Sequence, residues 1–207
     1  LPCVIVNVMR CGPGLGGIHP SQGDYFQAVK GGGHGDYRLI VLAPGSVQEM
    51  ADLTFEAFDL ADKWRNPVMI LADGLLGQMM EPVEFAVREP QSYPKPWATT
   101  GAEGRRPNII NTLDIVPESL EKRNYALADK YAQIAKEETR WQEYETADAE
   151  LIIAAYGTSA RAARSAVDRA RQNGMKVGLI RPISLWPFPL APFIQAADGR
   201  RQFWLLK

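Results

Sequence analysis

The fold class is decided by residues 39–72, LIVLAPGSVQEMADLTFEAFDLADKWRNPVMILA. One apolar run opens this stretch, another closes it, and neither alternates with polar residues, which predicts strands that are buried on both faces. Between the two runs, Ser46 and Glu49 form a capping box whose hydroxyl and carboxylate can satisfy free backbone amides. A helix is therefore expected to start here. Strand, helix and strand in this order are typical of a mostly parallel sheet covered by helices.

Similar apolar runs recur along the rest of the chain. They span residues 4–9, 151–155, 177–180 and 203–206. A second amphipathic helix is expected from Thr158 to Asn173, with Gly174 placed to end it. The start of this helix, Gly157-Thr158-Ser159, could bind an anion, although a plain cap is the preferred interpretation. We therefore predict an α/β protein with mostly parallel sheets and helices on both faces.

The middle of the chain has a different character. Six prolines interrupt residues 82–117, which favours a linker. A charged helix is expected from about Glu118 to Glu143. Its apolar seam consists of Leu120, Leu127, Tyr131, Ile134 and Trp141. We predict two lobes, at residues 1–90 and 148–207, joined by a linker and bridging helix at 91–147. Both ends lie in apolar runs, so we expect the chain to be part of a longer protein.

Composition excludes several classes of protein. The 207 residues carry a formal net charge of -1 and are 46% hydrophobic, which is ordinary for a globular domain and argues against disorder and against nucleic-acid or membrane-surface binding. No run reaches the length of a membrane span, and Leu1 to Ile5 lack the features of a signal peptide, so a cytoplasmic location is expected. Cys3 and Cys11 are too few to hold a four-thiolate iron–sulfur cluster. No metal site is predicted.

Glycines give the strongest local signal for a binding site. Nine of the 18 glycines fall between Gly12 and Gly35. Gly12, Pro13, Gly14 and Gly16 follow the first strand directly, and ligands of open α/β sheets bind outside the carboxyl ends of strands. The spacing matches neither the dinucleotide nor the Walker fingerprint. A tight turn at the sheet edge is the alternative explanation of these glycines.

Five polar residues around this loop are candidates for chemistry. Arg10 could hold a carboxylate or phosphate through its planar fork, or it could form a salt bridge with a partner. His19 and His34 could carry protons, or could serve only as hydrogen-bonding residues. Gln22 and Asp24 could contact a ligand, although Asp24 also suits the N-cap of a helix that starts at the next residue.

Several stretches together resemble the alpha subunit of 2-oxoacid:ferredoxin oxidoreductases. They are VNVMRCGPGLG at 6–16, PSQGDYFQA at 20–28 and GHGDYR at 33–38, followed in the same order by 42–49, 66–73 and segments between 155 and 189. The resemblance covers essentially the whole chain. Many members of that family carry Ser-Thr where this chain has Gly14-Leu15. The version found here resembles the VorB-type, branched-chain subgroup, which acts on 2-oxoisovalerate.

The resemblance implies a reaction and its components. The reaction is oxidative decarboxylation of a 2-oxoacid to an acyl-CoA, with thiamine diphosphate and Mg²⁺ shared with a partner subunit, coenzyme A as co-substrate and ferredoxin as electron acceptor. Beta and gamma/delta subunits would hold the iron–sulfur clusters. The lobes would be the back part of a pyrimidine-binding-type domain and a truncated transketolase-C-terminal-like domain.

The resemblance also assigns roles to residues. It places Arg10 beside the substrate carboxylate as a catalytic residue. Eight candidates from the loop and its surroundings are predicted to lie near substrate or cofactor: Gly12, Pro13, Gly14, Gly16, His19, Gln22, Asp24 and His34. The family's glutamate for the aminopyrimidine ring lies upstream of residue 1, so we expect this chain alone to be inactive. The alternatives are a non-catalytic assembly subunit, a pyruvate- or 2-oxoglutarate-specific member of the family, and an unrelated nucleotide-binding protein.

Overall fold

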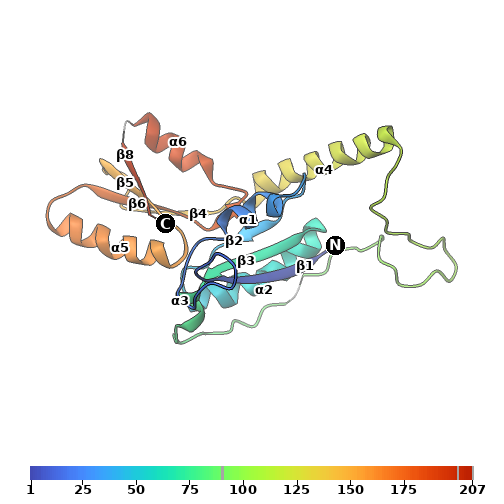
Figure 1. Cartoon of the computed structure of the whole chain (residues 1–207), viewed down its shortest axis with the longest axis horizontal. Helices are drawn as coiled ribbons and strands as arrows, with labels where there is room; N and C mark the ends of the chain where they lie inside the picture. Colours follow the sequence, from blue (N-terminus) through green and yellow to red (C-terminus); the bar gives the residue numbers. More distant parts are fainter. Residues whose placement is uncertain (90, 200, 207) are drawn as a thin grey trace.

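Two four-stranded sheets form the frame of the computed structural model, which describes residues 1–89, 91–199 and 201–206 (Figure 1). The first sheet has the order β1 (Cys3–Met9), β3 (Pro67–Asp73), β2 (Ile40–Leu42), β7 (Ser184–Trp186). The second has the order β4 (Trp141–Tyr144), β6 (Val177–Pro182), β5 (Leu151–Ala154), β8 (Gln202–Leu205). All strand pairs are parallel except β2 with β7 and β4 with β6. The six predicted strands are confirmed, whereas β4 and β7 were not predicted.

Helices cover both faces of each sheet, which confirms the predicted α/β class. They are α1 (Tyr25–Val29), α2 (Val47–Trp64), α3 (Gly74–Gln78), α4 (Pro117–Glu137), α5 (Gly157–Gln172) and α6 (Leu190–Asp198), with a short 3-10 helix at Gly31–Gly33. On the first sheet, α2 covers one face and α1 the other. Figure 1 shows α5 and α6 on opposite faces of the second sheet, where Leu179 and Ile180 belong to separate buried clusters.

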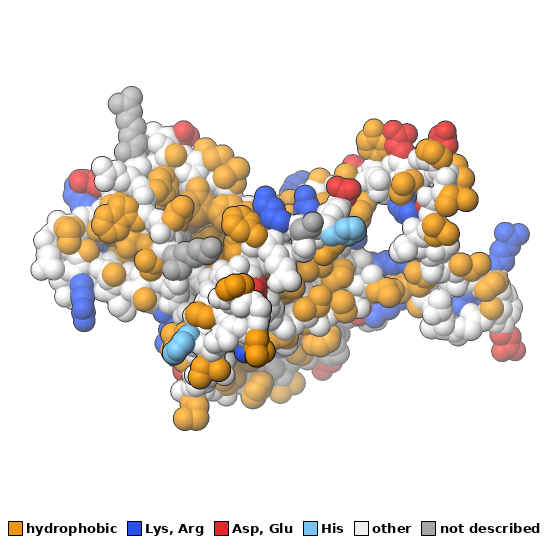
Figure 2. All heavy atoms as spheres, viewed as in Figure 1, with side chains coloured by type: hydrophobic (Ala, Val, Ile, Leu, Met, Phe, Trp, Pro, Cys, Tyr) orange, Lys and Arg blue, Asp and Glu red, His pale blue; other side chains and the backbone are white. Residues whose placement is uncertain are grey.

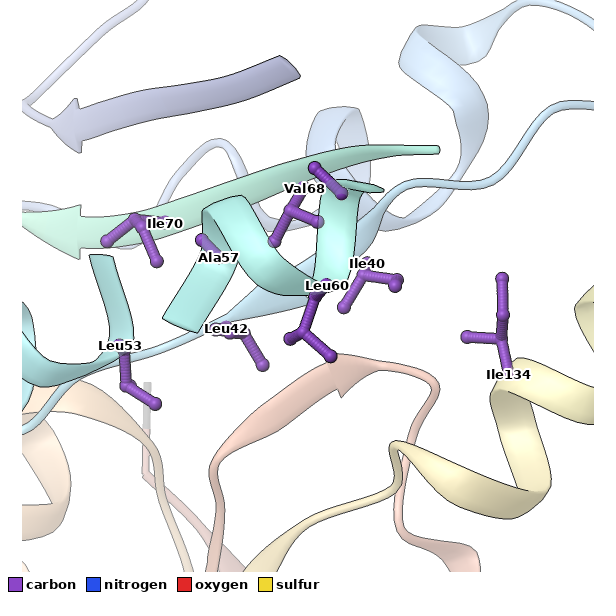
Figure 3. Close-up of a cluster of buried hydrophobic side chains, with 9 residues drawn as sticks. Ile40, Leu42, Leu53, Ala57, Leu60, Val68, Ile70 and Ile134 are labelled. Atoms are coloured by element: carbon purple, nitrogen blue, oxygen red, sulfur yellow. The ribbon is translucent and has the colours of Figure 1, made fainter. Parts of the chain in front are cut away.

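The capping box starts α2 as predicted, with one difference. The Ser46 hydroxyl accepts the Glu49 N–H at 3.1 Å, while the Glu49 carboxylate accepts the N–H of Gly45 at 2.8 Å rather than that of Ser46. The helix then lays Leu53, Ala57 and Leu60 on the sheet (Figure 3). These residues form the main core with Ile40, Leu42, Val68 and Ile70.

The bridging helix is shorter than predicted. α4 ends at Glu137, and Trp141 belongs to β4 instead of the helical seam. Ile134 is fully buried against the first sheet, whereas Leu120 is 38% exposed because the first half of α4 projects away from both sheets (Figure 1).

The limits of the two lobes, 1–90 and 148–207, stay a prediction. β4 lies inside the predicted linker and helix but joins the second sheet, and β7 joins the first.

The expectation that the first strand is buried on both faces is wrong. Ile5, Val6 and Val8 of β1 are 37%, 52% and 41% exposed. The reason is that β1 is an edge strand, paired only with β3.

No helix within the described residues is long and apolar enough to span a bilayer.

Candidate substrate site

The candidate site lies at one edge of the first sheet. Because β1, β3 and β2 are parallel, their carboxyl ends meet at this edge. Met9, the last residue of β1, lies directly opposite Asp73, the last residue of β3. Arg10 therefore leaves the sheet next to Gly74, at the place where ligands of open α/β sheets bind.

The glycine loop is closed at its base and tight inside. Arg10 and Pro20 form an antiparallel bridge, and the Cys11 N–H donates to the His19 carbonyl at 2.8 Å. Within the loop, the Gly17 N–H donates to the Cys11 carbonyl at 2.9 Å. Gly16 has a φ of +58°, and a Cβ there would lie 1.8 Å from the Cys11 carbonyl oxygen. The tight-turn explanation thus holds for this glycine, and the turn exposes Arg10 at its mouth.

Arg10 has a free guanidinium. The residue is exposed, and its side chain makes no hydrogen bond or ion pair with any part of the chain that the structure describes. The guanidinium is therefore available to a substrate or to a residue of a partner subunit. A planar fork of donors on the carboxyl edge of a sheet suits bidentate binding of a carboxylate.

Gln22 and Asp24 follow the loop and make internal contacts. Gln22 is only 7% exposed, and its Nε2 donates to the Tyr156 carbonyl at 3.1 Å, while its Oε1 is buried without a partner. The Asp24 carboxylate accepts from Asn7 Nδ2 at 3.1 Å. Asp24 precedes α1, but its side chain makes no hydrogen bond to the backbone of that helix. The prediction that the Asp24 side chain caps α1 is therefore wrong. The reason is that Asn7 engages the carboxylate.

The two histidines lie in different places. His19 is exposed within the loop, where its carbonyl closes the base. His34 follows the 3-10 helix and precedes the amino end of β2, whereas Arg10 follows the carboxyl end of β1. Figure 2 shows two histidine side chains on separate parts of the surface. The structure therefore brings His19, but not His34, to the loop with Arg10.

Sequence reasoning missed a cavity that both lobes line. Its volume is about 200 Å³, and its walls are formed by Pro20, Ser21, Gln22, Asp73, Leu75, Thr158 and Ser159. Asp73 is 4% exposed; one carboxylate oxygen accepts the N–H groups of Leu75 and Leu76 at 3.1 Å each, and the other accepts the Thr158 hydroxyl. The position of Asp73 directly after a strand was the available signal.

Tyr156 lies next to Gln22, whose Nε2 donates to its carbonyl. Its hydroxyl is buried without a partner, and its ring lies 5.9 Å from the ring of Tyr25. Burial raises the pKa of Tyr156, and Tyr25, Asp73 and Asp24 act in the same direction, so the hydroxyl keeps its proton.

Among residues 1–89, 91–199 and 201–206, no three His, Cys, Asp or Glu side chains gather in a way that could hold a metal ion.

Comparison with known proteins identifies the family. Residues 1–152 match the family model described as pyruvate flavodoxin/ferredoxin oxidoreductase, thiamine diphosphate-binding, and residues 149–206 match pyruvate:ferredoxin oxidoreductase core domain II. A 2-oxoglutarate:ferredoxin oxidoreductase from Magnetococcus marinus, with 2-oxoglutarate, coenzyme A and succinyl-CoA bound, shares the fold with a TM-score of 0.78 at 24% identity, over 99% of this chain and 41% of that chain.

Curated relatives place the chain more closely. It is 54% identical to the ketoisovalerate oxidoreductase subunit VorB of Methanothermobacter marburgensis, over 96% of this chain and 57% of the relative. It is 36% identical to the 2-oxoglutarate synthase subunit KorA of Methanocaldococcus jannaschii, over 91% of this chain and 58% of the relative. The chain thus spans somewhat more than half the length of these relatives. The family model covers most of the chain and agrees with the resemblance seen in its motifs, so the chain belongs to the pyruvate flavodoxin/ferredoxin oxidoreductase family.

Proposed function

We propose that the chain is the alpha-type part of a multi-subunit 2-oxoacid:ferredoxin oxidoreductase that converts 2-oxoisovalerate to an acyl-CoA and passes electrons to ferredoxin. One observation carries the proposal: the unpaired guanidinium of Arg10 stands on the carboxyl edge of the first sheet, at the mouth of the glycine loop. The 54% identity to a ketoisovalerate oxidoreductase subunit supports the choice of substrate.

The loop suits a 2-oxoacid with an apolar side chain. Arg10 would bind the carboxylate through two parallel hydrogen bonds. Leu15 and Ile18 of the same loop are 83% and 76% exposed, so they offer apolar surface to a branched acyl chain. The same surface would disfavour the second carboxylate of 2-oxoglutarate, because a charge placed against apolar side chains loses hydration without gaining a partner.

The residues of this chain suit the substrate side of a thiamine diphosphate site. Arg10 offers a free cationic fork, and the buried Gln22 Oε1 offers an unused acceptor. The metal-binding half is assigned to a partner beta subunit, since no group of metal-ligating side chains gathers within the described residues. When bound, thiamine diphosphate would supply carbanion stabilisation, while this chain would bind and orient the 2-oxoacid.

The other components belong to the same proposal. Coenzyme A is the acyl acceptor, an assignment supported by the Magnetococcus protein of the same fold that holds coenzyme A and succinyl-CoA. Iron–sulfur clusters are assigned to the partner subunits, because the two cysteines of this chain, Cys3 and Cys11, are too few for a four-thiolate cluster. We place the complex in the cytoplasm.

The test uses the complete complex under anaerobic conditions. The measurement is the CoA-dependent reduction of a viologen dye with 2-oxoisovalerate, pyruvate or 2-oxoglutarate. We expect 2-oxoisovalerate to give the highest kcat/KM. If another 2-oxoacid is preferred, the substrate assignment is wrong. If a cofactor-loaded complex reduces dye with none of them, the chain is a non-catalytic assembly subunit.

An arginine variant tests the site itself. Arg10→Ala should assemble normally and lose nearly all turnover, since the substrate carboxylate loses its bidentate partner. Arg169→Ala is the matched control, because Arg169 is also an exposed arginine but lies on α5 away from the loop. Unchanged turnover in Arg10→Ala would show that the loop is only a turn.

A further inference from the structure

The second lobe touches the first directly behind the substrate loop. Gln22, two residues after the loop's closing residue Pro20, crosses to the carbonyl of Tyr156, which is the N-cap of α5. Gln22 is 7% exposed and Tyr156 is half-buried, so this hydrogen bond is partly shielded from solvent. The chain that leaves the loop is thereby attached to the start of α5.

A second hydrogen bond attaches the neighbouring strand. The Thr158 hydroxyl donates to the carboxylate of Asp73, which lies opposite Met9, the residue just before Arg10. The same carboxylate caps α3 through two further hydrogen bonds, so its position is fixed from both lobes. The end of β3, which is paired with the strand end that enters the loop, therefore has its own link to α5.

Gly157 lies between these two links. It has a φ of +58°, and a Cβ there would lie 3.3 Å from Gln22 Nε2 and 3.6 Å from Asp73 Oδ2. The cavity of about 200 Å³ lies beside the links, so the two hydrogen bonds, rather than continuous packing, connect the lobes here. A displacement of the first turn of α5 therefore acts on the residues on either side of Arg10 through Gln22 and Asp73.

We propose that Thr158 and Gln22 are positioning residues, through which the second lobe holds the base of the substrate loop and so sets where the Arg10 guanidinium stands. The inference rests on the proposed function and adds to it a role for the second lobe. Thr158 needs no contact with the substrate for this role. Small displacements of a binding group lower catalytic efficiency disproportionately, because bidentate geometry tolerates little misalignment.

The test compares three variants of α5 in the complete complex. Thr158→Val keeps the shape of the side chain and removes the hydroxyl, Thr158→Ser restores the hydroxyl, and Arg161→Gln breaks a different contact between the lobes, the 2.7 Å ion pair with Glu81. We expect Thr158→Val to raise the KM for 2-oxoisovalerate roughly three- to tenfold. The KM for CoA should stay unchanged, and Thr158→Ser and Arg161→Gln should behave as wild type in both KM values. Gln22→Met serves as a second variant from the other side of the interface, with the same expected result as Thr158→Val.

A second measurement does not depend on turnover. Hydrogen exchange of the amides of Cys11 and Gly17, which close the loop, should be faster in Thr158→Val and Gln22→Met than in wild type and in Arg161→Gln. Equal exchange in all forms overturns the inference, and so does a KM for CoA that rises in parallel with that for the 2-oxoacid. A wild-type complex without turnover overturns the proposed function instead, and the exchange rates then decide the positioning role alone.

Discussion

Glu49 and Arg181 join the start of α2 to the second sheet. Arg181 Nη1 donates to Glu49 Oε1 at 2.9 Å, and Nη2 donates to the other carboxylate oxygen. The same carboxylate accepts the Gly45 N–H at 2.8 Å. One residue of the capping box thus also anchors the other lobe. Burial raises the pKa of Glu49, but the hydrogen bonds from Arg181 and Gly45 outweigh this effect, so that the pKa is lowered.

The lowered pKa predicts a pH-dependent effect of Glu49→Gln. A carboxyl group with a lowered pKa in the folded state contributes stability that is fully present above its unfolded pKa, about 4, and that is lost as pH falls through the folded pKa. We expect the variant to be less stable than wild type by about 1–2 kcal/mol at pH 7. The difference should vanish in acid, as thermal unfolding from pH 7 down to pH ~3 would show.

Glu150→Gln is the control for this pH series. Glu150 pairs with Lys176 at 3.3 Å, but its side chain is 77% exposed. Its effect should stay within about 0.5 kcal/mol at every pH, because exposed pairs contribute little. A Glu49→Gln difference that persists unchanged into acid would contradict the role assigned to the ionised carboxylate.

Two glycines of the substrate loop should respond differently to alanine. Gly16→Ala places a Cβ 1.8 Å from the Cys11 carbonyl oxygen, so the hydrogen bond from Gly17 to Cys11 must break. Gly14 has a similar φ of +65° but open space around its Cβ, so its alanine variant costs only about 1 kcal/mol of backbone strain. We expect a rise in the KM for 2-oxoacid of more than about tenfold for Gly16→Ala. Similar KM values for Gly16→Ala and Gly14→Ala would refute the idea that the backbone conformation of the loop determines substrate binding.

The buried end of α4 should matter more than its exposed start. Ile134 is fully buried against Ile40 and Leu60 (Figure 3), so Ile134→Ala should lower the free energy of unfolding by about 2–5 kcal/mol. Leu120→Ala on the projecting half should cost about 1 kcal/mol or less. Urea unfolding measures both. Equal losses of unfolding free energy in the two variants would mean that both halves of α4 pack against the rest of the isolated chain.

Charge alone should not replace Arg10. Lysine keeps the positive charge but lacks the planar fork that matches a carboxylate. We expect Arg10→Lys to raise the KM for 2-oxoisovalerate about tenfold or more, with normal assembly of the complex. Steady-state kinetics beside wild type check this, and a wild-type KM in the lysine variant would exclude bidentate binding.

Local patterns predicted the parts of the fold that depend on local physics. The capping box at Ser46 starts α2, and continuous apolar runs mark six strands. β4 was missed because Trp141 continues the helical spacing of α4. The helix ends earlier because the Arg140 carbonyl accepts the N–H groups of Ile183 and Ser184, at the start of β7 in the first sheet. β7 has only three residues and is bounded by prolines, so no periodicity could reveal it.

In the candidate site, too, some features follow from the local sequence and others depend on tertiary packing. Sequence by itself determined the glycine loop, the position of Arg10 after a strand and the resemblance to a family, because these are read from neighbouring residues. Only the tertiary structure decided that Arg10 has no side-chain partner among the described residues, that β1 lies at an edge, and that His34 lies apart from the loop. It also brought Gln22 to Tyr156, which lie 134 residues apart. Such contacts depend on how strands and helices from distant segments pack, and local spacing carries no information about that packing.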